Sequence, residues 1–191
     1  MKLVILDRDG TINEDSDDYV KSPEEWAPLP GALEAIARLN HSGWHVVIAS
    51  NQSGLGRGLF DVSTLNAMHA KMNKLLAAVG GRVDAIFYCP HAPDDGCRCR
   101  KPEPGLFEQI GERYGLDLHD VPMVGDSARD VLAGLAAGCE PHLVLTGRGA
   151  AYIGRSLPET FPKETQVHAD LAAFADFLIA RETAAAAAAV V

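Results

Sequence analysis

The chain has 191 residues, of which 47% are hydrophobic and 23% are charged, and its formal net charge is −9. These values are those of an ordinary globular protein, and the length fits one domain with a sizeable core. The negative charge argues against nucleic acid or an acidic membrane surface as a partner, so an anionic ligand would need a local cationic pocket.

Strands and helices are predicted to alternate along the chain. Apolar runs rich in β-branched residues predict five strands, at residues 2–6, 44–49, 83–88, 121–124 and 142–145. Helical spacing of apolar residues predicts helices at residues 31–41, from Asp61 or Ser63 to Leu76, and at residues 104–114, 128–137 and 171–181. This order predicts an α/β fold, a Rossmann-like three-layer sandwich with a central parallel sheet.

The same order predicts the domain organisation. One domain is expected over residues 1–183, followed by an Ala-rich tail over residues 184–191 that is either disordered or a frayed helix. Only one helix and one strand separate Asp7 from Ser50, which leaves no room there for a large cap domain.

The first apolar run is too short for a signal peptide, and no stretch is long enough to span a membrane. A cytoplasmic protein without membrane contact is therefore expected.

Acidic residues follow two of the predicted strands. Asp7 and Asp9 come directly after the first strand, and residues i and i+2 of an extended chain point the same way. Asp126 follows the fourth strand, and ligands bind beyond the carboxyl ends of parallel strands. Like charges so close repel unless a cation relieves them, and oxygen ligands suit Mg²⁺. The alternative is that each aspartate is an ordinary loop or cap residue.

Donors for an anion follow the second strand and the Cys-rich segment. Ser50 and Asn51 can donate hydrogen bonds to phosphate oxygens. Arg100 and Lys101 supply the cationic pocket that an acidic protein needs for an anionic substrate. The alternative for these two basic residues is a solvated surface pair.

A polar, Pro-rich segment, residues 89–99, carries three of the four cysteines and is called the Cys/His loop below. Three thiols and one imidazole form a closed tetrahedral set for structural Zn²⁺. The loop has little apolar material, so a metal ion would order it. The predicted ligands are Cys89, His91, Cys97 and Cys99. Cys139 is predicted to be a small core residue.

These motifs together resemble the haloacid dehalogenase superfamily over nearly the whole chain. The resemblance rests on the segment from Asp7 to Thr11, on Ser50-Asn51, on Lys101, and on Gly125-Asp126 with Asp130. It implies that Asp7 attacks phosphorus and that Asp9 protonates the leaving oxygen and later activates water. It also implies that Asp7, the backbone carbonyl of Asp9 and Asp126 hold Mg²⁺. Ser50 and Lys101 would complete the catalytic set, with Asp130 in support.

The Cys/His loop narrows the resemblance to two groups, the heptose 1,7-bisphosphate 7-phosphatases and the histidinol-phosphate phosphatases. The segments 50–58 and 100–105 resemble the heptose group. This implies hydrolysis of the 7-phosphate of D-glycero-D-manno-heptose 1,7-bisphosphate through an aspartyl-phosphate, in nucleotide-activated heptose synthesis for lipopolysaccharide. Arg57 would bind the second phosphate or sugar hydroxyls. The implied substrate-binding residues are Asn51, Gln52, Ser53, Arg57 and Arg100.

Alternatives stay open at this level. The acidic run at residues 14–18 is either a solvated face or a substrate-facing flap, with Asp15 and Asp18 as its candidate substrate contacts. A short Cys/His loop and Ser127, which replaces a lysine of some heptose enzymes, favour histidinol phosphate as substrate. A non-catalytic phospho-ligand binding module is the alternative from another class. A phosphorylated sugar as ligand and a monomeric state are expected.

Overall fold

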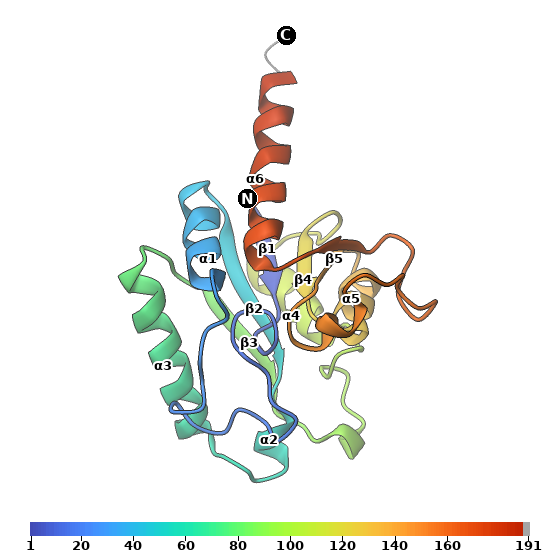
Figure 1. Cartoon of the computed structure of the whole chain (residues 1–191). Helices are drawn as coiled ribbons and strands as arrows, with labels where there is room; N and C mark the ends of the chain where they lie inside the picture. The colour runs from blue at the N-terminus through green and yellow to red at the C-terminus, as the bar shows by residue number, and fades with distance from the viewer. Residues whose placement is uncertain (189–191) are drawn as a thin grey trace.

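Six parallel strands form the centre of the described part of the chain (Figure 1). The computed structural model describes residues 1–188, and residues 189–191 of the predicted tail lie outside it. The strands are β1 Leu3–Leu6, β2 His45–Asn51, β3 Ala85–Cys89, β4 Pro122–Gly125, β5 Glu140–Val144 and β6 Gln166–His168. Their order across the sheet is β3-β2-β1-β4-β5-β6.

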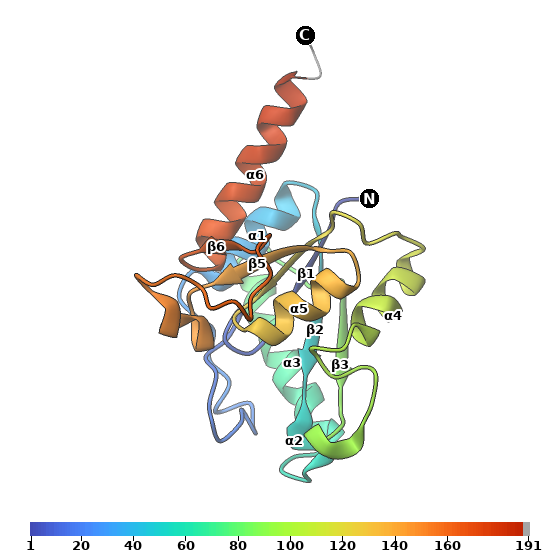
Figure 2. The same ribbon diagram turned by 90° about the vertical axis from the view of Figure 1, so that its right-hand side faces the viewer.

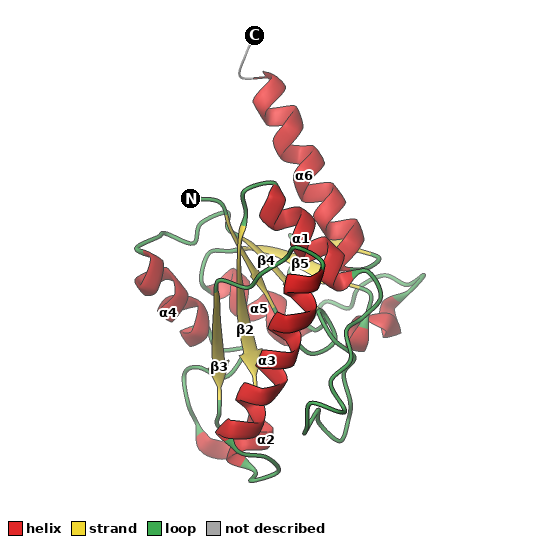
Figure 3. Ribbon diagram, turned by 90° about the vertical axis from the view of Figure 1, so that its left-hand side faces the viewer, coloured by secondary structure: helices red, strands yellow, loops and turns green. Residues whose placement is uncertain are grey.

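Helices cover both faces of this sheet, which confirms the three-layer fold (Figure 3). The helices are α1 Ala32–His41, α2 Ser53–Gly56, α3 Val62–Ala78, α4 Gly105–Tyr114, α5 Ala128–Ala136 and α6 Leu171–Ala188, with 3-10 turns η1 Pro93–Asp95 and η2 Gly147–Tyr152. Helices α1, α3 and α6 pack on one face, and α4 and α5 pack on the other. Within residues 1–188 the strands and helices follow one another without an inserted cap domain.

Side-chain alternation in the buried strands explains the two layers. In β1, Val4 and Leu6 pack with the α1, α3 and α6 layer, whereas Leu3 and Ile5 pack with α4 and α5. The start of α3 is fixed by Asp61, whose carboxylate accepts a hydrogen bond from the backbone N–H of Thr64 at 2.8 Å. Asp61 is thus the cap of this helix, one of the two predicted alternatives.

Three elements differ from the sequence prediction. The short helix α2 and the edge strand β6 were not predicted, because one is rich in glycine and the other is polar. Helix α6 continues past Arg181 to Ala188 and projects from the body (Figure 1). Residues 184–188 of the tail are therefore helical, the second of the two predicted alternatives, since alanine is the best helix former. No described helix is both long and apolar enough to cross a membrane.

All six strands are parallel, so their carboxyl ends lie along one edge of the sheet; Figure 2 shows β2 and β3 ending near α2. Asp7 follows β1, Asn51 ends β2, Cys89 ends β3 and Asp126 follows β4. The parallel sheet therefore brings the predicted phosphate site and the Cys/His loop to the same edge.

Candidate active site

Lys101 lies at the centre of a buried polar cluster at the ends of β1, β2 and β4. Its side chain is 2% exposed, and Nζ lies 2.7 Å from Asp7 Oδ1 and 2.6 Å from Asp130 Oδ1. Nζ also donates to the carbonyl of Ala49 at 2.8 Å. Burial alone would lower the pKa of Lys101, but the carboxylates of Asp130 and Asp7 outweigh it and raise that pKa. The ammonium group is therefore charged and fixed between two acids.

Three carboxylates meet beside this ammonium group, and they are called the acid cluster below. Asp7, Asp126 and Asp130 are buried, and their oxygens lie within 4.8 Å of one another. Burial raises the pKa of Asp7 to about 7, and burial with the charges of Asp130 and Asp7 raises that of Asp126 to about 9. One ammonium group cannot neutralise three acids, so the donor set fits a divalent cation such as Mg²⁺.

Asp130 has protein partners for both of its carboxylate oxygens. Oδ1 binds Lys101, and Oδ2 accepts hydrogen bonds from the backbone N–H of Ser127 at 3.0 Å and from its hydroxyl at 2.6 Å. Ser127 thus caps α5 through Asp130. These bonds leave Asp7 and Asp126 as the acids with free coordination sites, which agrees with a supporting role for Asp130.

Two glycines, in the loops after β1 and β5, allow the backbone to pass close to the carboxylate of Asp126. Gly10 has a φ of +84°, and a Cβ there would lie 2.0 Å from Asp126 Oδ2. A Cβ on Gly147 would lie 2.2 Å from the same oxygen. The loop after β5 also binds the segment from Asp7 to Thr11, because Thr146 Oγ1 donates to the carbonyl of Gly10 at 2.7 Å. A larger residue at either glycine would displace a predicted metal ligand.

Asp9 lines the same pocket as Asp7, as predicted, but the hydrogen-bond partners of its carboxylate lie outside the acid cluster. Arg8 Nη2 donates to it at 2.9 Å, Asn13 Nδ2 at 2.9 Å and Gln52 Nε2 at 2.8 Å. Burial would raise the pKa of Asp9, but these donors, Arg8 foremost, lower it. The physical reason is Arg8, which is fully buried and needs a carboxylate partner.

The residues at the end of β2 bind one another and Lys101. Asn51 Nδ2 donates to the carbonyl of Lys101 at 3.1 Å, and Asn51 Oδ1 accepts from its N–H at 3.0 Å. Gln52 Nε2 donates to Ser50 Oγ at 2.8 Å, so the Ser50 hydroxyl hydrogen remains for another acceptor. Asn51, Gln52 and Ser53 line the pocket over the acid cluster. Asn51, predicted to bind phosphate, therefore fixes the backbone of Lys101.

Three arginines line this pocket: Arg100, which was predicted, and Arg129 and Arg148, which were not. Nη1 of Arg100 is buried without a hydrogen-bond partner among the described residues, a state that suits an anionic ligand. Arg148 follows β5, so extending the strand-end rule to the fifth strand would have found it. Arg129 directly precedes Asp130 at the start of α5, beside the segment Gly125-Asp126 that the sequence had singled out.

Residues 14–20, called the flap below, also border the pocket. The flap residues that line it are Asp15, Ser16, Asp17, Tyr19 and Val20. This placement favours the substrate-facing alternative for Asp15. Asp18 is not among the lining residues, and neither is Arg57, whose guanidinium carbon lies 5.9 Å from the ring centre of Tyr19. Direct substrate contacts of Asp18 and Arg57 stay predictions.

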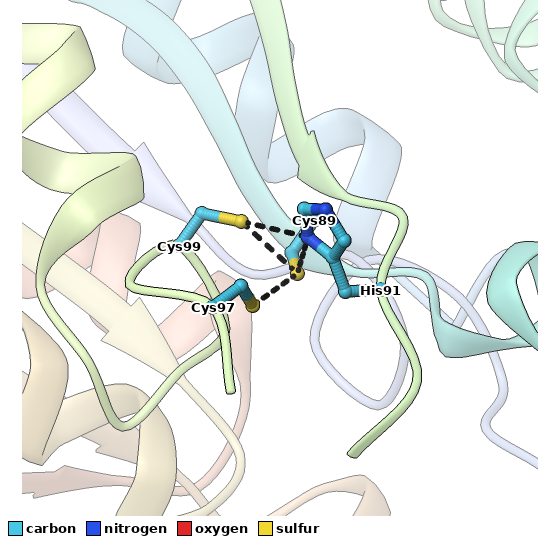
Figure 4. Close-up of side chains that lie close together, drawn as sticks. All are labelled: Cys89, His91, Cys97 and Cys99. Atoms are coloured by element: carbon cyan, nitrogen blue, oxygen red, sulfur yellow. Dashed lines mark hydrogen bonds between the residues drawn. The ribbon is translucent and has the colours of Figure 1, made fainter. Parts of the chain in front are cut away.

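The Cys/His loop brings its four predicted ligands together (Figure 4). Cys89 Sγ lies 3.6 Å from Cys97 Sγ and 3.2 Å from Cys99 Sγ, and His91 Nδ1 lies 3.2 Å from Cys99 Sγ. Sulfur ligands about 2.3 Å from a tetrahedral Zn²⁺ ion lie about 3.8 Å apart, so the set fits a closed zinc site. Cys139 is 2% exposed and packs in the core, as predicted.

Comparison with known proteins agrees with this geometry. Residues 98–173 match the HAD-hydrolase-like family. A D-glycero-beta-D-manno-heptose-1,7-bisphosphate 7-phosphatase of Bordetella bronchiseptica is 58% identical over 179 residues, which cover 94% of this chain and 98% of the relative. An enzyme of the same name from Pseudomonas aeruginosa is 54% identical, over 93% of this chain and 97% of that protein.

A solved structure matches as well. The crystal structure of the D,D-heptose 1,7-bisphosphate phosphatase from B. bronchiseptica, complexed with magnesium and phosphate, has a TM-score of 0.90 and 57% identity. The match covers 95% of this chain and 99% of that one. With relatives more than half identical over nearly their whole lengths, the chain belongs to the D-glycero-beta-D-manno-heptose-1,7-bisphosphate 7-phosphatase family of the haloacid dehalogenase superfamily.

Proposed function

We propose that this chain is a Mg²⁺-dependent phosphatase that hydrolyses the 7-phosphate of D-glycero-D-manno-heptose 1,7-bisphosphate through an aspartyl-phosphate. The reaction would serve nucleotide-activated heptose synthesis for lipopolysaccharide. The relatives named for this activity support the substrate, and the relative solved with magnesium and phosphate supports the ion. The observation that carries the proposal is the buried Lys101 between Asp7 and Asp130, on the floor of a pocket with three arginines.

Asp7 is the proposed nucleophile. Lys101 holds Oδ1, so Oδ2 is the oxygen left to attack phosphorus and form the aspartyl-phosphate. Lys101 also lies where it can neutralise charge on the transferring phosphoryl group, and the hydroxyl of Ser50 can donate to it. A Mg²⁺ ion held by Asp7, the backbone carbonyl of Asp9 and Asp126 would supply the remaining charge neutralisation.

Asp9 is the proposed acid and base. Its bonds from Arg8, Asn13 and Gln52 favour the carboxylate, the form that takes a proton from the water attacking the aspartyl-phosphate. The earlier acid step needs Asp9 protonated. A phosphate dianion arriving beside Asp9 favours that form, because a second negative charge raises the pKa of a neighbouring carboxyl group.

Zn²⁺ in the Cys/His loop is proposed to be structural. The four ligands leave no open position for substrate, so the ion would order the loop that leads to Arg100 and Lys101. A cytoplasmic location is part of the proposal and is supported by the free thiols of the four cysteines, which suit a reducing compartment. The predicted monomeric state belongs to it too, and light scattering of the purified chain tests it.

The decisive experiment compares phosphate release from heptose 1,7-bisphosphate and from histidinol phosphate, with and without Mg²⁺. We expect kcat/KM to be at least about a hundredfold higher for the bisphosphate, because arginines in the pocket repel an ammonium group. NMR of the product should show the phosphate lost from C7. A preference for histidinol phosphate would replace the proposed substrate. Tight binding of both compounds without turnover would favour a non-catalytic phospho-ligand module.

A further inference from the structure

The loop after β5 places Arg148 at the rim of the pocket, and none of the proposed catalytic steps uses its side chain. The backbone N–H of Arg148 donates to Asp126 Oδ2 at 2.8 Å. Its side chain is 53% exposed, and Nε lies 3.3 Å from Asp15 Oδ2. The backbone of Arg148 is therefore fixed by the acid cluster, while its guanidinium group reaches across to the flap.

The Asp15–Arg148 ion pair is one that an anionic ligand can displace. Both side chains are partly exposed, and an ion pair in contact with water contributes little to stability. A phosphate dianion offers a guanidinium group two parallel, charge-assisted hydrogen bonds, which are stronger. A hydroxyl group or an ammonium group offers nothing that competes with the carboxylate of Asp15.

We propose that Arg148 is a specificity-determining residue that exchanges Asp15 for the non-reacting phosphate of the substrate. The inference rests on the proposed function, since it requires a ligand with two phosphates. One phosphate lies at the acid cluster beside Lys101, and the other takes Arg148 at the rim. The unpaired Nη1 of Arg100, in the same pocket, is a second donor for the rim phosphate.

Asp15 contributes to the selectivity for a bisphosphate over a monophosphate, because its carboxylate competes with the second phosphate for Arg148. A monophosphate leaves the Asp15–Arg148 pair intact and gains nothing from it. A bisphosphate breaks the pair, and the freed carboxylate then repels the dianion, so the exposed end of the flap moves away from the pocket. Removing the charge of Asp15 should therefore favour the bisphosphate, and it should do so only where Arg148 is present.

The test measures equilibrium binding by calorimetry in an Asp7→Asn background with Mg²⁺, so that no turnover occurs. The ligands are heptose 1,7-bisphosphate and heptose 7-phosphate. Arg148→Ala keeps the backbone N–H that Asp126 uses, and the side chain is exposed, so the fold should persist. We expect it to weaken bisphosphate binding by about ten- to a hundredfold and monophosphate binding by less than about threefold. Arg148→Lys should recover part of the loss.

Two further variants separate this role from a general charge effect. Asp15→Asn should tighten bisphosphate binding by about two- to fivefold alone and have no effect combined with Arg148→Ala. Arg155→Ala removes the same charge from an exposed position outside the pocket lining and should leave both affinities unchanged.

The outcomes are distinguishable from those of the proposed function. Equal losses on both ligands in Arg148→Ala, or no loss on either, would overturn the role of Arg148 while the bisphosphatase activity of the wild type still stood. An Asp15→Asn effect that persists without Arg148 would overturn the exchange. A wild type that turns over heptose 7-phosphate as efficiently as the bisphosphate would instead remove the proposed substrate, whatever Arg148 does.

Discussion

The acid cluster and the Cys/His loop each gather metal ligands at the same end of the sheet, but different forces hold them in place. The acid cluster stands on the ends of buried strands and contains its own cation, because Lys101 binds two of its three acids. In the Cys/His loop, His91 is exposed and Cys97 and Cys99 are half-buried. Residues 90–98 contribute no buried hydrophobic side chain. Hydrogen bonds of the protein thus organise the first site, whereas a metal ion must organise the second.

The protonation states of the ligands without a metal ion also differ between the two sites. Burial raises the pKa of the Cys89 thiol to about 12, so this ligand is a neutral thiol until a metal ion binds. In the acid cluster, burial would raise the pKa of Asp130, but Lys101 outweighs it and lowers that pKa. A metal ion therefore completes an existing arrangement at the acid cluster and creates one at the loop.

The largest expected effect is a loss of catalysis without a loss of stability when Asp7, in the acid cluster, is substituted. Asp7→Asn should lower kcat by at least about a thousandfold, because an amide is a poor nucleophile toward phosphorus. The thermal midpoint should stay the same or rise, since one of several buried like charges is removed. Phosphate release and calorimetry measure the two quantities, with mass spectrometry excluding deamidation. A variant with kcat near that of the wild type would contradict the covalent mechanism.

The next largest effect is the loss of stability expected when the buried ammonium group of Lys101 is removed. Lys101→Met should lower the free energy of unfolding by about 3–5 kcal/mol, because Asp7 and Asp130 lose their buried partner. Added Mg²⁺ should restore part of this loss in denaturant titrations. Lys71→Met is the matched control: its ammonium group binds two backbone carbonyls at 2.7 Å, so the cost should be about 1–2 kcal/mol. Equal costs for the two variants would show that the acid cluster does not depend on Lys101.

Loss of a loop ligand should have a smaller effect on stability and little on chemistry. Cys97→Ser should remove about one zinc ion per chain and cost about 3 kcal/mol of unfolding free energy. Hydrolysis of a small phosphate ester should remain within about tenfold of the wild type, because the acid cluster forms without the loop. Cys139→Ala, in the core, should keep its zinc in metal analysis. Active wild-type protein without zinc or a substitute metal would contradict the loop assignment.

The contrast also explains what the sequence could predict. Strands β1, β2 and β4 were predictable because they are continuous apolar runs, and their ends placed Asp7 and Asp126 without further information. Strand β6 is three residues long and polar, so nothing in its composition distinguishes it from a loop. The hydrogen bond of 3.0 Å between His142 and His168 depends on the pairing of β5 with β6 and was missed with it.

The hydrogen-bond and ion-pair partners of the site residues were harder to predict from the sequence than the site residues themselves. Arg8 stands in a loop and resembles a surface residue, yet it is fully buried and binds Asp9. Its burial follows from packing, which no local pattern encodes. The ligands of the Cys/His loop were predictable together, because the chemistry of Cys and His at that spacing is specific. Arg148 carries no motif, so only its place after the fifth strand could have indicated it, whereas its ion pair with Asp15 required the folded chain.

The smallest expected effect tests whether protons and Mg²⁺ relieve the same repulsion in the acid cluster. Burial, with Asp130 and Asp7, raises the pKa of Asp126 to about 9, whereas the unfolded chain has a carboxyl pKa of about 3.9. Between pH 8 and 7 the native state holds a proton on Asp126 that the unfolded state has lost. Without Mg²⁺, the free energy of unfolding should therefore increase by about 1 kcal/mol as the pH falls over this window.

Saturating Mg²⁺ should abolish this pH dependence, because the ion keeps Asp126 ionised in the native state as it is in the unfolded chain. Asp126→Asn without the ion should reduce it to the smaller slope that Asp7, with its pKa of about 7, contributes. The Cys/His loop provides the internal control. Cys97→Ser changes the stability of the chain but leaves the acid cluster intact, so its Mg²⁺-linked pH slope should equal that of the wild type. A slope that persists with Mg²⁺ would mean that the cation does not bind at Asp126. A slope that disappears in Cys97→Ser would mean that the two sites are not built independently.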